Sequence, residues 1–170
     1  MAQPTEAIGV DAVKQRILLD LDRCVGCKTC AAACYHAHDR MPIVQHSRLA
    51  AATLPLLCRQ CEQPPCVDAC PSGAMQRNEN GVVSRSMLLC WGCGSCTLAC
   101  PFGALPQDLT RHVIAKCDLC EDLTTAGGRP RCVAACPVGA LQFVAPQEMP
   151  EKDLQLIGGR ATGRNPFRRR

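Results

Sequence analysis

The stretch that decides the fold runs Cys90-Trp91-Gly92-Cys93-Gly94-Ser95-Cys96-Thr97-Leu98-Ala99-Cys100-Pro101. Its four cysteines have the spacing C-x2-C-x2-C-x3-C, and a proline follows at once. This spacing puts three thiols on one short loop, where they can hold three iron corners of a cubane, while the fourth reaches a neighbouring cluster. The stretch therefore predicts one 4Fe–4S site and a second one close to it.

The chain contains three more cysteine groups, and none of its sixteen cysteines is left over. The first group is Cys24, Cys27, Cys30 and Cys34; the second is Cys58, Cys61, Cys66 and Cys70; the fourth is Cys117, Cys120, Cys132 and Cys136. We therefore predict four 4Fe–4S clusters with all sixteen cysteines as iron ligands, and no catalytic residue.

Three of the groups close with the same unit. The three copies read Cys70-Pro-Ser-Gly-Ala-Met, Cys100-Pro-Phe-Gly-Ala-Leu and Cys136-Pro-Val-Gly-Ala-Leu. Proline ends a helical turn, and the Gly-Ala-apolar step that follows favours the start of a strand. Such repetition of one small unit indicates duplicated modules.

Zinc and disulfides are the alternative uses of so many cysteines. C-x2-C pairs also occur in zinc ribbons, but three cysteines at C-x2-C-x2-C suit a cubane better than a zinc ion. A disulfide scaffold needs an oxidising compartment. Residues 1–13 lack the basic segment followed by an apolar segment that marks a secretory signal. Clusters are the better interpretation.

Length and composition limit the remaining possibilities. The 170 residues suit one domain or two small ones. Aromatic residues make up only 3% of the chain, so folding is expected to depend on the inserted clusters.

The formal charge of +4 counts cysteines as neutral, whereas cluster-bound thiols are deprotonated and give about −2 per cubane. The basic balance is therefore no argument for nucleic acid, and scarce aromatic residues also oppose that partner.

The length of the apolar runs indicates where in the cell the protein is expected. No apolar run approaches the roughly 18–20 residues of a membrane span. The sequence predicts a cytoplasmic protein without a membrane span, although a signal-bearing partner could carry it across a membrane.

A few short elements are predicted between the cysteines. Residues 16–22 have the bulk and partial alternation of a strand, and Ala31 to Ala33 favour a helical turn that carries Cys34. The turn residues at 78–81 lead into Val82-Val83 and predict a hairpin. Residues 150–157 are predicted to form a helix, closed by two glycines.

Three longer segments are predicted as loops. Residues 35–57 are interpreted as a connection, and Pro64-Pro65 as a stiffener of a loop without helix. The long gap between Cys120 and Cys132 holds two glycines and a proline, which indicate a flexible surface loop.

The chain from residue 17 to about residue 144 resembles the four-cluster iron–sulfur subunits of complex oxidoreductases. These include the electron-transfer subunits of dimethyl sulfoxide reductase, formate dehydrogenase, formate hydrogenlyase, carbon monoxide dehydrogenase and tungsten aldehyde oxidoreductase systems. The resemblance rests on the four spacings in this order, with x4 in the second group and x11 in the fourth, and on Tyr35 in place of proline after the first group.

The resemblance implies an α+β fold of two ferredoxin-like modules of the bacterial two-cluster type. One module is inserted in the other, with short strands, helical turns and long loops. The expected division is an extension at 1–16, an outer module at 17–57 plus 105–145, an inner module at 58–104, and a C-terminal helix and arginine-rich tail at 146–170.

The resemblance also implies how the ligands pair, because each cluster takes its fourth cysteine from a partner group. The implied sets are Cys24, Cys27, Cys30 and Cys136; Cys117, Cys120, Cys132 and Cys34; Cys58, Cys61, Cys66 and Cys100; and Cys90, Cys93, Cys96 and Cys70. The clusters would form a row from the Cys24 site to the Cys90 site. Some relatives hold a 3Fe–4S cluster where tryptophan replaces the second cysteine of the third group, but Cys93 is kept here.

The resemblance implies a non-catalytic electron-transfer subunit. Its expected partners are a catalytic subunit, with a molybdenum or tungsten pterin enzyme for aldehyde or formate preferred over a nickel enzyme, and a second electron acceptor or donor. The alternatives are a free-standing polyferredoxin and a self-associating wire in which end clusters of successive copies abut.

A few other residues have two interpretations. His36 and His38 suggest a metal pair, but such histidines are more often surface or interface residues. Lys28 and Lys116 stand beside cysteines, where positive charge would raise a cluster's potential, or they are ordinary solvated lysines. The arginines of the tail either remain solvated or bind an acidic face of a partner or of a second copy.

Overall fold

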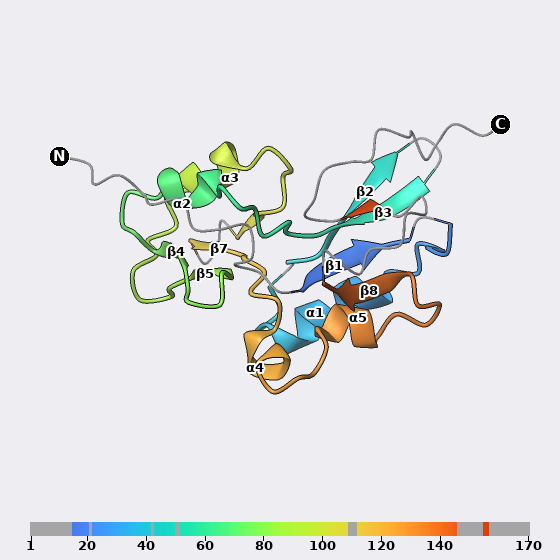
Figure 1. Ribbon diagram of the computed structural model, residues 1–170. Coiled ribbons are helices and arrows are strands. Elements are labelled where there is room, and N and C mark those ends of the chain that lie inside the picture. The colour runs from blue at the N-terminus through green and yellow to red at the C-terminus, as the bar shows by residue number, and fades with distance from the viewer. Residues whose placement is uncertain are drawn as a thin grey trace.

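The computed structural model describes residues 15–20, 22–41, 43–49, 52–108, 112–145 and 155–156. These residues form short strands and short helices joined by loops, as the predicted α+β class requires (Figure 1). The arginine-rich tail and residues 1–14 lie outside the described residues. In the part of the chain that is described, every helix is too short or too polar to cross a membrane.

One half of the structure is built on β1 (Arg16–Leu19), the predicted first strand. It lies between β8 (Leu141–Val144) and β9 (Gln155–Leu156) and is antiparallel to both. All four residues of β1 are buried because the strand has a neighbour on each side and a packed core on its face. Strands more than 120 positions apart in the sequence thus share one sheet.

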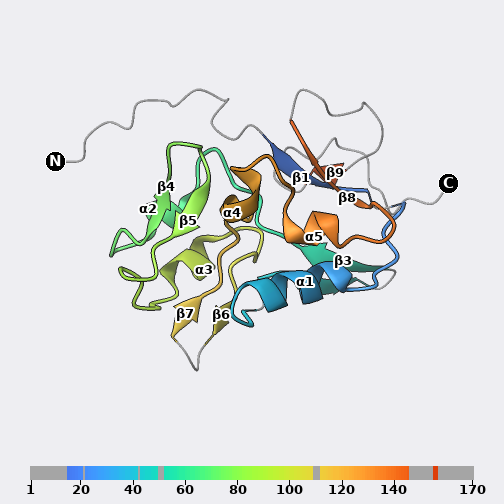
Figure 2. The ribbon, with the colours of Figure 1, turned by 90° about the horizontal axis from the view of Figure 1, so that it is seen from below.

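Two helices pack together in this half. The helix α1 (Thr29–Ala37) contains the predicted alanine turn, and α5 (Arg131–Ala134) contacts it (Figure 2). Cys30 and Cys34 are buried because positions four apart lie on the same face of a helix. The first and fourth cysteine groups therefore meet in one core.

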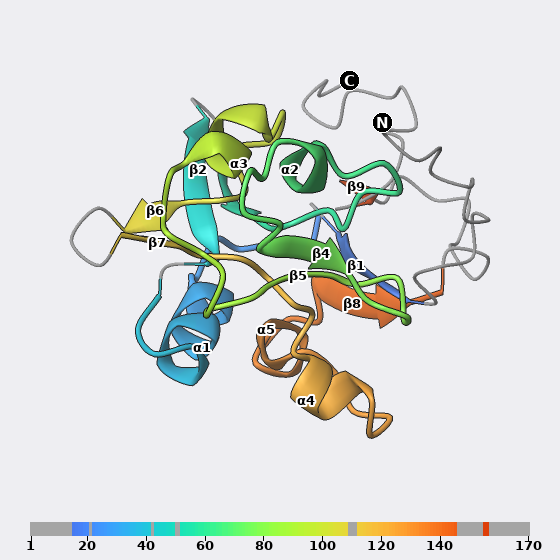
Figure 3. The same cartoon turned by 90° about the vertical axis from the view of Figure 1, so that its left-hand side faces the viewer.

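The other half holds the second and third cysteine groups. Its helices α2 (Pro65–Asp68) and α3 (Ser95–Ala99) contact each other (Figure 3). The hairpin β4 (Met75–Arg77)–β5 (Val83–Arg85) confirms the turn predicted at residues 78–81. Pro65 does begin a helical turn, contrary to the prediction of a plain loop, because proline is well tolerated at the first position of a helix.

A second small hairpin, β6 (Gln107–Asp108) with β7 (Val113–Ile114), belongs to this half as well. Leu105 and Ile114 are buried together with Met75 and Cys96 in a separate apolar core. Leu105 and Ile114 thus pack with the inner cysteine groups.

The repeated Cys-Pro-x-Gly-Ala unit forms the same turn three times. The N–H of Gly73, Gly103 or Gly139 donates to the carbonyl of the cysteine three positions earlier, at 3.3 Å in each case. The three glycines have φ values of 64°, 61° and 64°, the left-handed region that glycine adopts without strain. After two of the three turns a strand begins at once, at Met75 and at Leu141, as predicted.

Two of the predicted loops contain regular structure. The connection at 35–57 includes the hairpin β2 (Gln45–Leu49)–β3 (Ala52–Leu56), in which Pro55 pairs with His46. A proline removes a ladder donor and obscured this strand in the sequence. The gap after Cys120 begins with the helix α4 (Glu121–Thr124), so only its second part is loop.

The helix predicted at 150–157 falls mostly outside the described residues. The two described positions, Gln155 and Leu156, form β9, so the helical prediction is wrong there. The backbone partners of β9 come from β1, near the other end of the chain. Such long-range pairing leaves no local signal in a two-residue segment.

Candidate metal centres

All sixteen cysteines lie within the described residues, and none forms a disulfide. Most of them belong to or pack against the two apolar cores: the first and fourth groups largely in one, the third group in the other, and the second group in both. Every donor in these groups is a thiol, a soft ligand that suits iron–sulfur clusters.

The first gathering of thiols joins the loop before α1 to the end of α5. Burial raises the pKa of Cys30, and the neighbouring thiols of Cys27, Cys24 and Cys136 raise it further. Cys136 is more than 100 positions away in the sequence, and the packing of α5 against α1 brings it close. These four are one of the implied ligand sets.

The second gathering includes Cys34, one turn after Cys30 on α1. Burial raises the pKa of Cys34 to about 12, with a further contribution from Cys120. Burial likewise raises the pKa of Cys132 to about 12, and Cys34 and Cys120 add to it. Cys117 is buried, and burial, Cys58 and Cys132 raise its pKa.

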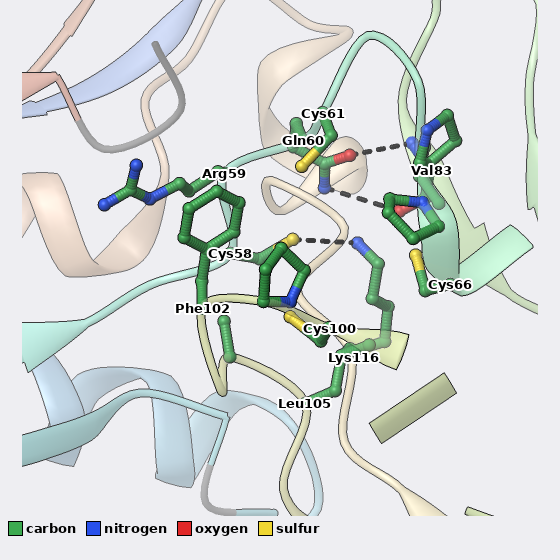
Figure 4. Close-up of a pocket in the computed structure, with 14 residues that line it drawn as sticks. Cys58, Arg59, Gln60, Cys61, Cys66, Val83, Cys100, Phe102, Leu105 and Lys116 are labelled. Atoms are coloured by element: carbon green, nitrogen blue, oxygen red, sulfur yellow. Dashed lines mark hydrogen bonds between the residues drawn. The ribbon is translucent and has the colours of Figure 1, made fainter. Parts of the chain in front are cut away.

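The third gathering lines a pocket formed mainly by the second cysteine group and the residues that follow Cys100 (Figure 4). Cys58, Cys61, Cys66 and Cys100 surround about 370 Å³ of space between atoms, part of it open to solvent. Burial raises the pKa of Cys66 to about 11; Lys116 lowers it, and Cys58 and Cys100 raise it.

The fourth gathering includes the opening stretch of the sequence. Cys70, Cys90, Cys93 and Cys96 line a pocket with about 280 Å³ of space between atoms, part of it open to solvent. Burial raises the pKa of Cys96, and Cys70 and Cys90 contribute to the rise.

The thiols fit iron–sulfur clusters on physical grounds. Several acidic groups crowded into a buried site raise one another's pKa values, because two nearby thiolates repel. Positively charged iron bound between them removes this repulsion and keeps each thiol deprotonated. The residues present therefore fit iron–sulfur clusters, with the four cysteines of each gathering as the groups that would hold one.

Two cysteines present their thiols to solvent. Cys27 and Cys93 are exposed, and each has a hydroxyl two positions later. Thr29 Oγ1 donates to Cys27 Sγ at 3.3 Å, and Ser95 Oγ lies 3.5 Å from Cys93 Sγ. The side-chain bond from the hydroxyl is the main cause that lowers the pKa of each thiol.

Of the two lysines that stand beside cysteines in the sequence, Lys116 contacts a thiol. Its Nζ donates to Cys58 Sγ at 3.2 Å and to the carbonyl of Cys117 at 2.7 Å (Figure 4). Lys28 is exposed, and among the described residues no hydrogen bond joins it to a sulfur. The two lysines that look alike in the sequence thus have different environments.

The histidines also differ in their environments. His38 Nε2 lies 3.6 Å from Cys120 Sγ, and this hydrogen bond is the main cause that raises the pKa of His38. His36 is exposed and its ring packs edge-on against Tyr35, so the two histidines do not form a pair around one site. His46, which carries no motif, lies with Nε2 4.0 Å from Cys30 Sγ.

Sequence reasoning missed Gln60. This residue is only 2% exposed, and its Nε2 donates to the carbonyl of Cys117 at 2.7 Å. The same amide exchanges two hydrogen bonds with the backbone of Val83. No local pattern marks it, because all of its partners lie more than 20 positions away.

Comparisons with known proteins identify two iron–sulfur family matches in the chain. The family described as the 4Fe–4S dicluster domain matches residues 49–145, and a 4Fe–4S binding domain matches residues 21–34. The chain belongs to the 4Fe–4S dicluster domain family. Its dicluster domain spans the second, third and fourth cysteine groups, and the shorter match covers the first.

Two relatives add detail to the dicluster domain assignment. The B subunit of anaerobic dimethyl sulfoxide reductase from Escherichia coli K12 is 37% identical over 153 residues, which cover 79% of this chain and 75% of that protein. Thiosulfate reductase electron transfer subunit PhsB of Salmonella typhi is 36% identical over 141 residues, which cover 75% of this chain and 73% of that protein. The predictions of 4Fe–4S clusters and of a non-catalytic electron-transfer subunit are confirmed.

Proposed function

We propose that this dicluster protein carries electrons through a row of four 4Fe–4S clusters between a catalytic oxidoreductase subunit and a second redox partner. The observation that carries the proposal is the convergence of sixteen thiols into four gatherings. When bound, the clusters supply one-electron redox chemistry. The protein supplies ligands, burial and hydrogen bonds, and it keeps the sites in a fixed order.

The proposed ligand sets are those implied by the resemblance to the four-cluster subunits. The order of the row is supported by electrostatic contacts between neighbouring gatherings. Cys30 raises the pKa values of Cys34 and Cys132, which links the first gathering to the second. Cys58 raises the pKa of Cys117, which links the second to the third.

The two ends of the row are the proposed exits for electrons. The exposed thiols, Cys27 and Cys93, belong to the first and fourth gatherings. Within five positions of Cys93 in the sequence, Leu88 is 98% exposed and Leu98 is 90% exposed. We assign one partner to each end, because an exposed ligand brings its cluster close to a docked protein.

We also propose two modules with one inserted in the other. The outer module joins residues 17–57 to the chain after the second core, and the inner module begins at residue 58. Because Leu105 and Ile114 are buried in the inner core, the inner module is proposed to extend to Ile114 and not to stop at residue 104.

The catalytic partner is proposed to be a molybdenum or tungsten enzyme. Similarity to the B subunit of dimethyl sulfoxide reductase and to a thiosulfate reductase subunit supports a reductase of this class. Formate and aldehyde oxidation are the alternatives for its chemistry, since the same class of electron-transfer subunit serves both directions.

The test is metal analysis of the assembly purified without oxygen from its native host. About sixteen irons per chain, four for each of four clusters, together with molybdenum or tungsten, are expected. Reduction of the clusters by formate or an aldehyde, or oxidation by dimethyl sulfoxide or thiosulfate, then identifies the chemistry. A monomer with iron alone would indicate a free-standing carrier, and zinc in place of iron would refute the proposal.

The ligand pairing has its own test. Cys24→Ser and Cys136→Ser should disturb the same electron paramagnetic resonance signal, although the two residues belong to different groups. Cys93→Ser should alter a different signal and leave the others unchanged. If the Cys24 and Cys136 variants alter different signals, the crossed pairing is wrong.

A further inference from the structure

Lys116 lies at the junction between two of the cysteine gatherings. It directly precedes Cys117 of the fourth group, and its side chain points into the pocket lined by the second group (Figure 4). The residue is only 7% exposed. Its Nζ is 3.2 Å from Cys58 Sγ and 2.7 Å from the carbonyl oxygen of Cys117. A single ammonium group therefore contacts both sites.

The ammonium has an unusual counter-charge. Throughout the part of the chain that the structure describes, no carboxylate forms an ion pair with Lys116. A buried charge is costly unless a nearby opposite charge compensates it. Its contacts are a cysteine sulfur and a backbone carbonyl, and that sulfur would carry negative charge once it binds iron.

The charge of Lys116 acts from a buried position. Only 7% of the residue is exposed, so solvent screens its charge little. The pocket that its side chain enters is also lined by Cys61, Cys66 and Cys100. The ammonium therefore lies among the ligands proposed for one cluster.

Gln60 provides a neutral comparison at the same junction. Its Nε2 donates to the carbonyl of Cys117 at 2.7 Å, the same oxygen that accepts the bond from Lys116. It also bonds the N–H and the carbonyl of Val83. Gln60 therefore helps to hold the second group against the fourth, but it carries no charge.

From this geometry we infer that Lys116 tunes the redox potential of one cluster. Its fixed positive charge raises the midpoint potential of the cluster held by Cys58, Cys61, Cys66 and Cys100. Reduction of a bound cluster would add one negative charge, with the electron supplied by the neighbouring site and later passed on. The Lys116 ammonium would stabilise that added charge, so the cluster would hold an electron more strongly than its ligands alone allow. This inference rests on the proposed function.

The experiment uses the full chain, loaded with clusters and purified without oxygen. Midpoint potentials are measured by redox titration followed by electron paramagnetic resonance, after the iron content has been checked. The signal of the site is identified as the one that Cys66→Ser removes. Lys116→Met is expected to lower the reduction equilibrium constant of this site at least tenfold, about 59 mV for one electron.

Three variants separate charge from structure. Lys116→Arg keeps the charge and should stay within threefold of the wild type. Gln60→Leu loosens the junction without changing charge, and Lys28→Met removes an exposed lysine next to Cys27; both should also stay within threefold. If Lys116→Met loses iron, Lys116→Gln replaces it, because glutamine is a neutral donor, and the same tenfold decrease is expected.

Two results would overturn the inference. One is full iron content and a potential within threefold of the wild type in the neutral Lys116 variant. The other is an equal decrease in Gln60→Leu, which would assign the effect to the geometry of the junction. Failure of the proposed function looks different, because the wild-type chain would then lack about sixteen irons or a reducible signal at this site.

Discussion

Gly92 offers a sharp test of the packing around the third cysteine group. It stands between Cys90 and Cys93 with φ +74°, and a Cβ built on it would lie 1.8 Å from the carbonyl oxygen of His112. The carbonyl carbon of the same residue would be 2.5 Å away. Because the contact is with backbone, no side chain can turn aside, and either the cysteine loop or the entry to β7 must move.

The cost of Gly92→Ala has two parts. Left-handed backbone costs an L-residue about 1–2 kcal/mol. Displacing packed backbone adds about 1–3 kcal/mol. Gly73→Ala is a matched control, since Gly73 has φ +64° and a Cβ added there would meet nothing within 4 Å, so only the first part applies. Gly92→Ala should therefore destabilise the protein by about 1–3 kcal/mol more than Gly73→Ala.

The assay is thermal unfolding of the cluster-loaded chain under argon, followed by circular dichroism, with iron measured before heating. At about 2–4 °C per kcal/mol, Gly92→Ala should unfold roughly 2–12 °C below Gly73→Ala. Its iron loss should come first from the site of Cys90. Equal unfolding temperatures for the two variants would refute the reasoning, because the contact with His112 would then have no energetic effect.

Three further predictions concern the ends of the row and the role of iron. Thr29→Val and Ser95→Ala each remove a hydroxyl that is hydrogen-bonded to an exposed thiol. Each should therefore lower the midpoint potential of its own site in a redox titration. A shift at a distant site, or no shift, would contradict this. Leu88→Ser and Leu98→Ser should weaken co-purification with a partner at unchanged iron content, and full retention of every partner would count against an apolar docking end. Removal of iron by a chelator under reducing conditions should unfold the chain, measured by circular dichroism, because the free energy of binding the clusters, which joins distant cysteine groups, is lost. Retention of the native spectrum would show that the apolar cores suffice.

The local elements could largely be predicted from residue patterns. The strand at Arg16–Leu19, the helix that contains Ala31 to Ala33 and the hairpin around residues 78–81 all follow from neighbouring residues. The hairpin β2–β3 was missed because Pro55 lies within it, and β9 was mistaken for helix because its partner β1 is more than 130 positions away. Strand pairing over such distances leaves no short-range signal.

The chemistry of the candidate sites was determined by the sequence alone. Four cysteine groups with cubane spacing, three of them ending in Cys-Pro, specify soft ligands on short loops, and a short loop has few ways to place its side chains. Only the tertiary structure decided which distant groups lie together and what surrounds them. The packing of α5 on α1 brings Cys136 to the first group, and the junction between the cores buries Lys116 and leaves Lys28 in solvent. Those arrangements depend on contacts between segments far apart in the chain, so the same residue type beside a cysteine becomes a buried charge in one place and a solvated side chain in the other.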